Sequence, residues 1–183
     1  MGICTYIHLP DNVRFDDVAK VVAIAAGLQP EFRTFAGQPG SGYVRVPGID
    51  AKNSLFSAGI GEINFDGRHA LYHFESSYGG RLLNCGGSQF WCAVGRRLVD
   101  FFGGYVDYND CDDIAADYKR RPKSRAVNAP TSDSNWMKFQ NRLMRVKRIH
   151  MDELSLTPDG DQYKGEGGYM YTFDEDGLMT RCL

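Results

Sequence analysis

The sequence lacks any long hydrophobic run and any complete motif of a known catalytic or cofactor site. Its longest weakly polar stretch, residues 21–27, is far shorter than the run of about 18 apolar residues that a membrane-spanning helix needs. The first residues show neither the basic nor the apolar segment of a secretory signal peptide. The glycine-containing segment 37–42 lacks the Gly-Lys-Ser/Thr ending of a phosphate-binding loop. We therefore expect a cytoplasmic protein with no membrane partner and no cofactor.

Paired cysteines are also missing. The chain has five cysteines, and no two of them are separated by only two residues; they are Cys4, Cys85, Cys92, Cys111 and Cys182. An odd count without that spacing argues against a disulfide framework and against a zinc finger. Reduced thiols are expected, which agrees with a cytoplasmic location.

What is present is the composition of an ordinary globular protein. The chain has 183 residues, of which 43% are hydrophobic and 24% are charged, so neither a disordered chain nor a coiled coil is indicated. This length is sufficient to bury one core without disulfide or metal crosslinks. Residues 1–183 are predicted to form a single domain.

The order of the predicted elements favours an α+β fold. Helices are expected at residues 15–26, 88–102 and 134–148, and strands at residues 3–9, 43–46, 55–65, 69–75, 105–108, 169–173 and 178–182. This order predicts a mostly antiparallel sheet with two to three helices packed on one face. The first part is compatible with a ferredoxin-like split β-α-β core that carries added strands.

Local signals support several of these elements. Ser88 is suited to cap the second helix, and Gly103 follows its last apolar residues. The dipeptides at 66–67 and 176–177 are both Asp-Gly, which is typical of a tight hairpin turn. The spacing of apolar residues in the first two helices predicts that Val22, Trp91, Leu98 and Phe101 are buried.

Charge is distributed unevenly along the chain. Residues 119–148, which we call the basic island, contain ten Lys or Arg and one acidic residue, so their net charge is +9. Residues 1–118 carry −5, and residues 149–183, the acidic C-terminal hairpin region, carry −6. Concentrated charge of one sign predicts a partner of the opposite sign, inside or outside the chain.

The basic island predicts an anion-binding surface. Its candidate residues lie in a loop and in the helix that follows; they are Lys119, Arg120, Arg121, Lys123, Arg125, Lys138, Arg142 and Arg145. The last three are spaced i, i+4 and i+7, which places them on one helix face. Such a surface fits nucleic acid or a protein that binds it. The alternative is internal pairing with the acidic residues between 110 and 117.

An acidic cluster precedes the basic island and suggests a second kind of site. Asp107, Asp110 and Asp112 are close in sequence, and converging carboxylates bind Mg²⁺ or Mn²⁺. The calcium-loop pattern fails, because its sixth position is Asp112 rather than glycine. A polar turn is the simpler interpretation of these residues.

A third candidate site lies at the start of the second helix. Gly86, Gly87 and Ser88 lead into that helix, and Arg81 lies nearby in the sequence. Free backbone N–H groups at a helix start favour a small anion. The alternative is a tight turn with no ligand.

These observations favour a non-enzymatic cytosolic binding protein that engages an anionic partner. A small chain with separated charge also suits an inhibitor or regulator carried by a phage or mobile element. The alternatives are a metal-dependent enzyme that acts on a phosphate-containing substrate through the acidic cluster, and a binder of small anions at the second helix start.

Overall fold

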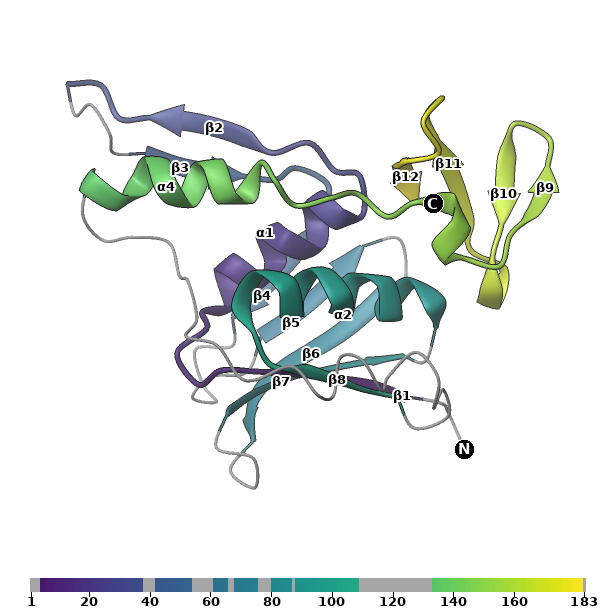
Figure 1. Cartoon of the computed structure of the whole chain (residues 1–183), viewed down its shortest axis with the longest axis horizontal. Helices are drawn as coiled ribbons and strands as arrows, with labels where there is room; N and C mark the ends of the chain where they lie inside the picture. Colours follow the sequence, from purple (N-terminus) through teal and green to yellow (C-terminus); the bar gives the residue numbers. More distant parts are fainter. Residues whose placement is uncertain are drawn as a thin grey trace.

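The structure is a computed structural model and describes residues 4–37, 42–53, 61–65, 68–75, 80–86, 88–108 and 133–182. Helices cover one face of a six-stranded antiparallel sheet, and a second, four-stranded sheet is formed by the C-terminal region (Figure 1). These features confirm the α+β class.

The six-stranded sheet is the largest element of the fold. In order across the sheet, its strands are β4 (Asp50–Asn53), β5 (Gly61–Phe65), β6 (Arg68–Glu75), β7 (Gly80–Gly86), β1 (Cys4–Leu9) and β8 (Tyr105–Tyr108). Every neighbouring pair is antiparallel. Phe65 lies opposite Arg68, as the predicted hairpin requires. The inner order β6-β7-β1-β8 is compatible with a split β-α-β core, and β4 and β5 extend it at one edge.

Two helices pack side by side on this sheet. They are α1 (Phe15–Ala25) and α2 (Gln89–Phe102). The four residues expected in the core, Val22, Trp91, Leu98 and Phe101, are all buried, which confirms the predicted apolar faces. The Ser88 hydroxyl accepts a hydrogen bond from the backbone N–H of Trp91 and caps α2, as expected.

A third helix, α4 (Asp133–Leu143), packs on the other two helices rather than on the sheet. Its Phe139 side chain is buried against Phe101 of α2, with the ring centroids 6.0 Å apart. Lys20 of α1 also lies over the Phe139 ring, with its Nζ 6.0 Å from the ring centroid. The strands β2 (Glu31–Thr34) and β3 (Gly42–Arg45) form a separate two-stranded ribbon (Figure 1).

The prediction that this helix continues to residue 148 is wrong. It ends at Leu143, a turn follows at residues 144–145, and residues 146–149 have no regular secondary structure. The backbone N–H of Ile149 donates to the carbonyl of Ala25, and the Ile149 carbonyl accepts from Met179. These two hydrogen bonds join the segment to α1 on one side and to the C-terminal sheet on the other. This tertiary pairing overrides the helix propensity of the segment.

The C-terminal region forms the four-stranded sheet. Its strands are β9 (Thr157–Asp159), β10 (Gln162–Lys164), β11 (Met170–Phe173) and β12 (Met179–Cys182), and two short 3-10 helices, η1 (Met151–Glu153) and η2 (Glu166–Gly168), lie before β9 and β11. The pairing of β11 with β12 confirms the predicted hairpin.

An arginine attaches this region to the main sheet. Arg68 of β6 is only 2% exposed, and its guanidinium carbon lies 5.1 Å from the ring centroid of Phe90, 4.2 Å from that of Tyr169 and 4.8 Å from that of Tyr171. A guanidinium over an aromatic face is attracted by the partial negative charge on that face of the ring. The contact joins β6, α2 and β11.

Candidate anion-binding cleft

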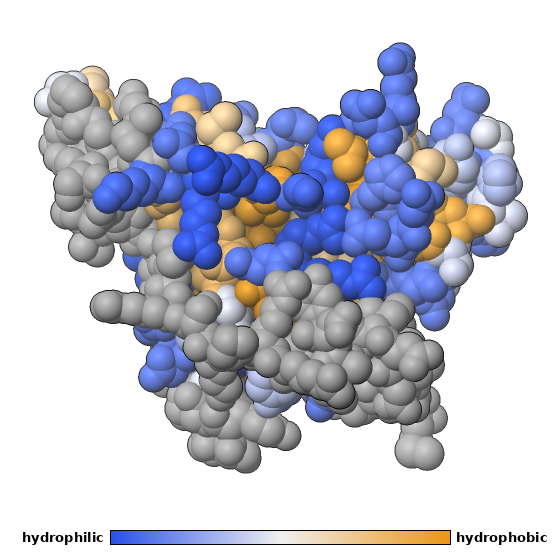
Figure 2. All heavy atoms as spheres, viewed as in Figure 1, coloured by the Kyte–Doolittle hydropathy of each residue, from blue (hydrophilic) through white to orange (hydrophobic). Residues whose placement is uncertain are grey.

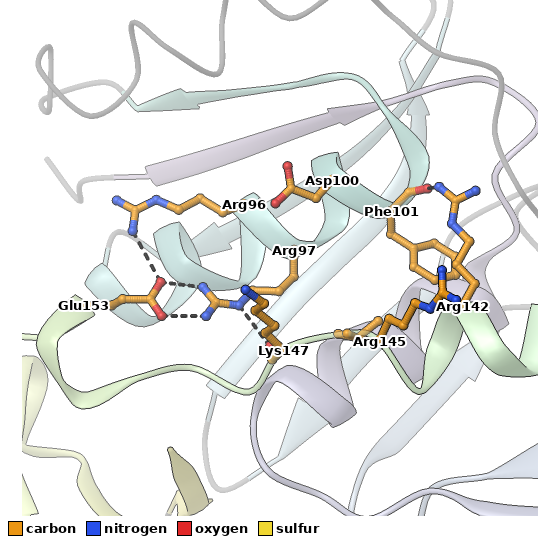
Figure 3. Close-up of a pocket in the computed structure, with 9 residues that line it drawn as sticks. Arg96, Arg97, Asp100, Phe101, Arg142, Arg145, Lys147 and Glu153 are labelled. Atoms are coloured by element: carbon orange, nitrogen blue, oxygen red, sulfur yellow. Dashed lines mark hydrogen bonds and ion pairs between the residues drawn. The ribbon is translucent and has the colours of Figure 1, made fainter. Parts of the chain in front are cut away.

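A cleft opens where α2, α4 and the segment after α4 meet. Its volume is about 640 Å³, and charged side chains dominate its lining (Figure 3). The lining residues are Arg96, Arg97, Asp100, Phe101, Arg142, Arg145, Val146, Lys147 and Glu153. We call it the basic cleft, because it holds five cations and two carboxylates. Hydrophilic side chains also dominate the outer face over α4 and the segment that follows it (Figure 2).

On the α2 side, Arg97 is committed to the fold. Its guanidinium forms a two-pronged ion pair with the Glu153 carboxylate. It also donates to the backbone carbonyls of Lys147 at 3.1 Å and Arg148 at 3.0 Å. Both charged side chains are largely buried, with 13% of Arg97 and 20% of Glu153 exposed. Arg97 therefore fixes the path of the chain from α4 to η1.

The carboxylate of Glu153 is held in its charged form. Burial raises its pKa, but hydrogen bonds from Arg97 and from the backbone N–H of His150 lower it, and the charges of Arg97 and Arg96 lower it further. The net result is a pKa below the ordinary value for glutamate. Glu153 therefore stays ionised at neutral pH.

At the opposite end of the cleft, Arg142 lies against an aromatic ring. Its guanidinium carbon is 4.8 Å from the ring centroid of Phe101, and it donates a hydrogen bond to the Phe101 carbonyl (Figure 3). Two contacts with one residue hold the guanidinium in place. Arg142 remains partly exposed.

Two cations of the basic cleft are exposed and make no ion pair with the described residues. They are Arg145 and Lys147, both in the segment after α4. Among the described residues, Arg96 forms one ion pair, at 3.4 Å from a Glu153 oxygen that Arg97 also binds.

The structure brings together part of the predicted basic surface. Arg142 and Arg145 both line the cleft, although Arg145 lies in the turn after the helix rather than on the helix itself. Lys138 is exposed on α4 and is not part of the lining. The other five candidates lie outside the described residues: Lys119, Arg120, Arg121, Lys123 and Arg125.

One cation of the basic island does pair within the chain. A guanidinium nitrogen of Arg148 lies 2.6 Å from a carboxylate oxygen of Asp174 in the C-terminal region. This contact joins the basic island to the acidic C-terminal hairpin region. The expected internal partners between residues 110 and 117 lie outside the described residues.

Of the three candidate metal ligands, Asp107 is the one that lies among the described residues. Asp107 lies on β8, opposite Tyr6 of β1, and Asp110 and Asp112 are outside the described residues. Within the described part of the chain, no group of three or more His, Cys, Asp or Glu side chains is placed to hold a metal ion.

At the start of α2, the chain supplies its own anion. The Glu166 carboxylate accepts a hydrogen bond from the backbone N–H of Gln89 at 3.2 Å. Gly86 lies at the end of β7 next to this helix start, and Gly87 is outside the described residues. Arg81 is at the other end of β7, about 17 Å away at the rise of an extended strand. Its guanidinium donates to the Asp11 carbonyl. The structure does not bring Arg81 to the helix start.

Sequence reasoning missed two cations of the cleft, Arg96 and Arg97, which form an adjacent pair in a mostly apolar helix. Lys147 belongs to the basic island but is not among its candidate anion-binding residues. The adjacent arginines could have been noticed as a polar interruption of the α2 face. Their meeting with α4 depends on tertiary packing, which local spacing does not encode.

No protein-family model, curated protein or solved structure matches the chain. None of the described helices combines the length and the apolar character that crossing a bilayer requires.

Proposed function

We propose that this protein is a binding protein that engages nucleic acid through the basic cleft. The observation that carries the proposal is the exposure of Arg145 and Lys147, which have no ion-pair partner among the described residues, beside a guanidinium held by Phe101. Five cations against two carboxylates give the lining a net charge of +3. Clustered cations of this kind attract phosphates and release the counterions bound to them.

The side chains of the cleft favour binding over catalysis. Glu153 has a lowered pKa and is held by Arg97, which makes it a poor proton donor or acceptor at neutral pH. Arginine keeps its proton under these conditions. These properties support a cleft that positions an anion, as an inhibitor or regulator of nucleic-acid machinery would require.

The proposal is tested by titrating labelled single- and double-stranded DNA at two salt concentrations. The test variant is Arg145→Ala with Lys147→Ala. The matched control is Arg33→Ala with Lys164→Ala, which removes the same charge from two exposed positions outside the cleft. We expect the test variant to bind at least about tenfold more weakly, because two phosphate contacts are lost.

The salt dependence gives a second readout. Each lost contact with a single strand should reduce the slope of log affinity against log salt by about 0.7, so the test variant should lose about 1.4. Equal affinities for the test variant and the control would contradict the cleft as the binding surface. Absence of any binding at low salt would exclude direct contact with nucleic acid and favour an acidic protein partner.

A further inference from the structure

We infer that the basic cleft takes an unpaired nucleotide, so that the protein prefers single-stranded nucleic acid to a duplex. This inference rests on the proposed function, because it names the form of the nucleic acid that the same cleft binds. It is carried by the arrangement of Arg142, Phe101, Arg145 and Lys147 around one cavity.

The size of the cleft suits a small unit. A volume of about 640 Å³ falls within the range of about 300–1,000 Å³ that is typical of small-ligand pockets. A duplex keeps its bases stacked inside and presents only its backbone to a cavity of this size. An unpaired nucleotide can insert its base and leave its phosphate at the rim.

Arg142 offers a stacking surface for that base. Single-strand-binding proteins stack bases on aromatic rings and on arginine guanidinium planes. Phe101 is only 5% exposed, and the Arg142 guanidinium lies over its ring. The partly exposed guanidinium is therefore the surface that a base would meet, and the hydrogen bond to the Phe101 carbonyl holds it in position.

Arg145 and Lys147 are the cations for the phosphate. In Figure 3 they lie on the wall opposite Asp100, which comes from α2, with Arg145 beside Arg142 and Lys147 beside Arg97. The Asp100 carboxylate repels a second phosphate, while a carboxylate accepts hydrogen bonds from the amino groups of bases. The cleft therefore places cations for a phosphate beside a surface suited to a base.

The test compares a labelled single-stranded oligonucleotide with a hairpin duplex of the same base composition, using the full chain at one low salt concentration. Arg142→Lys keeps the charge but removes the planar guanidinium. Arg33→Lys is the matched control, since it makes the same exchange at an exposed position outside the cleft. The readout is the ratio of the two affinities in one sample, which does not depend on the folded fraction of a variant.

We expect the wild-type protein to bind the single strand about tenfold more tightly than the duplex, which is the gain from one stacked base. Arg142→Lys should reduce this ratio to about one with an unchanged salt slope, and Arg33→Lys should preserve it. Nucleoside monophosphate should displace the single strand better than ribose 5-phosphate does. A wild-type preference for the duplex, or an unchanged ratio in Arg142→Lys, would overturn this inference and leave the proposed function standing. Failure of both probes to bind would instead overturn the proposed function.

Discussion

The two sides of the basic cleft carry charge of the same sign but differ in what their cations contact. On the α2 side, Arg97 is largely buried, paired with Glu153 and bonded to three backbone carbonyls. In the segment after α4, Arg145 and Lys147 are exposed and make no ion pair with the described residues. A charge count along the chain therefore does not distinguish cations that stabilise the fold from cations that are available to a partner.

Arg148 shows that this division also runs through the basic island. It lies one residue after Lys147, yet it forms an ion pair with Asp174. The sequence left open whether the basic island pairs with an external or an internal partner. Both can hold, because one residue can pair within the chain while its neighbour binds an external partner.

The largest effect on stability should come from the apolar neighbour of Arg97. Leu98 is fully buried in α2, so Leu98→Ala removes buried surface and leaves a cavity. We expect a loss of about 2–5 kcal/mol in the free energy of unfolding, measured by chemical denaturation. An unchanged unfolding transition would refute the packing of α2 on the sheet. The loss in the free energy of unfolding of each polar variant is compared with this value.

Arg97→Ala should have the next largest effect. It leaves the partly buried Glu153 carboxylate without its main partner and removes three hydrogen bonds to carbonyls. We expect a loss of about 2–3 kcal/mol in the free energy of unfolding, somewhat below the value for a fully buried pair because 20% of Glu153 is exposed. Arg96→Ala, one residue earlier, should cost less than about 1 kcal/mol. Equal losses for the two variants would show that Arg97 has no special structural role.

The same pair predicts a dependence of stability on acid. The pKa of Glu153 is lower in the folded state than its ordinary value, so the stabilisation is present above the unfolded pKa and is lost as the pH falls through the folded pKa. Unfolding measured from neutral pH downward should show this loss beginning near pH 4, the ordinary range of glutamate. Glu153→Gln should flatten this part of the profile. An identical profile in that variant would assign the acid dependence to other carboxylates.

The sequence predicted those parts of the fold in which local chemistry decides the structure. The Ser88 cap, the Asp-Gly hairpins and the apolar faces of α1 and α2 each depend on residues within a few positions of one another. Strand β7, near the middle of the sheet, was missed. Within β7, the consecutive residues Leu82 and Leu83 are both buried, on opposite faces of the sheet. The alternation of apolar and polar residues that identifies a strand is therefore absent.

The candidate site was predictable only in part for the same reason. Arg142 and Arg145 belong to one charged segment and are visible as such. Arg97 joins them through the docking of α2 against the segment around residue 147, a contact between residues about 50 positions apart. The end of α4 at Leu143 also depends on a distant partner, since Ile149 pairs with Ala25 and Met179.

The smallest effect on stability should come from the exposed cations. Arg145→Ala with Lys147→Ala removes no ion pair among the described residues, so we expect the free energy of unfolding to change by less than about 0.5 kcal/mol. A loss approaching that of Arg97→Ala would place these cations among the structural ones and would remove the contrast between the two sides of the cleft.

The most direct test of the basic cleft as a binding surface is therefore to measure unfolding free energy and affinity for single-stranded DNA in this double variant, alongside Arg33→Ala with Lys164→Ala. We predict unchanged stability in both variants, with a loss of affinity of at least about tenfold only when the cleft cations are removed. Lower stability with unchanged affinity would contradict this prediction, because Arg145 and Lys147 would then serve the fold rather than a ligand.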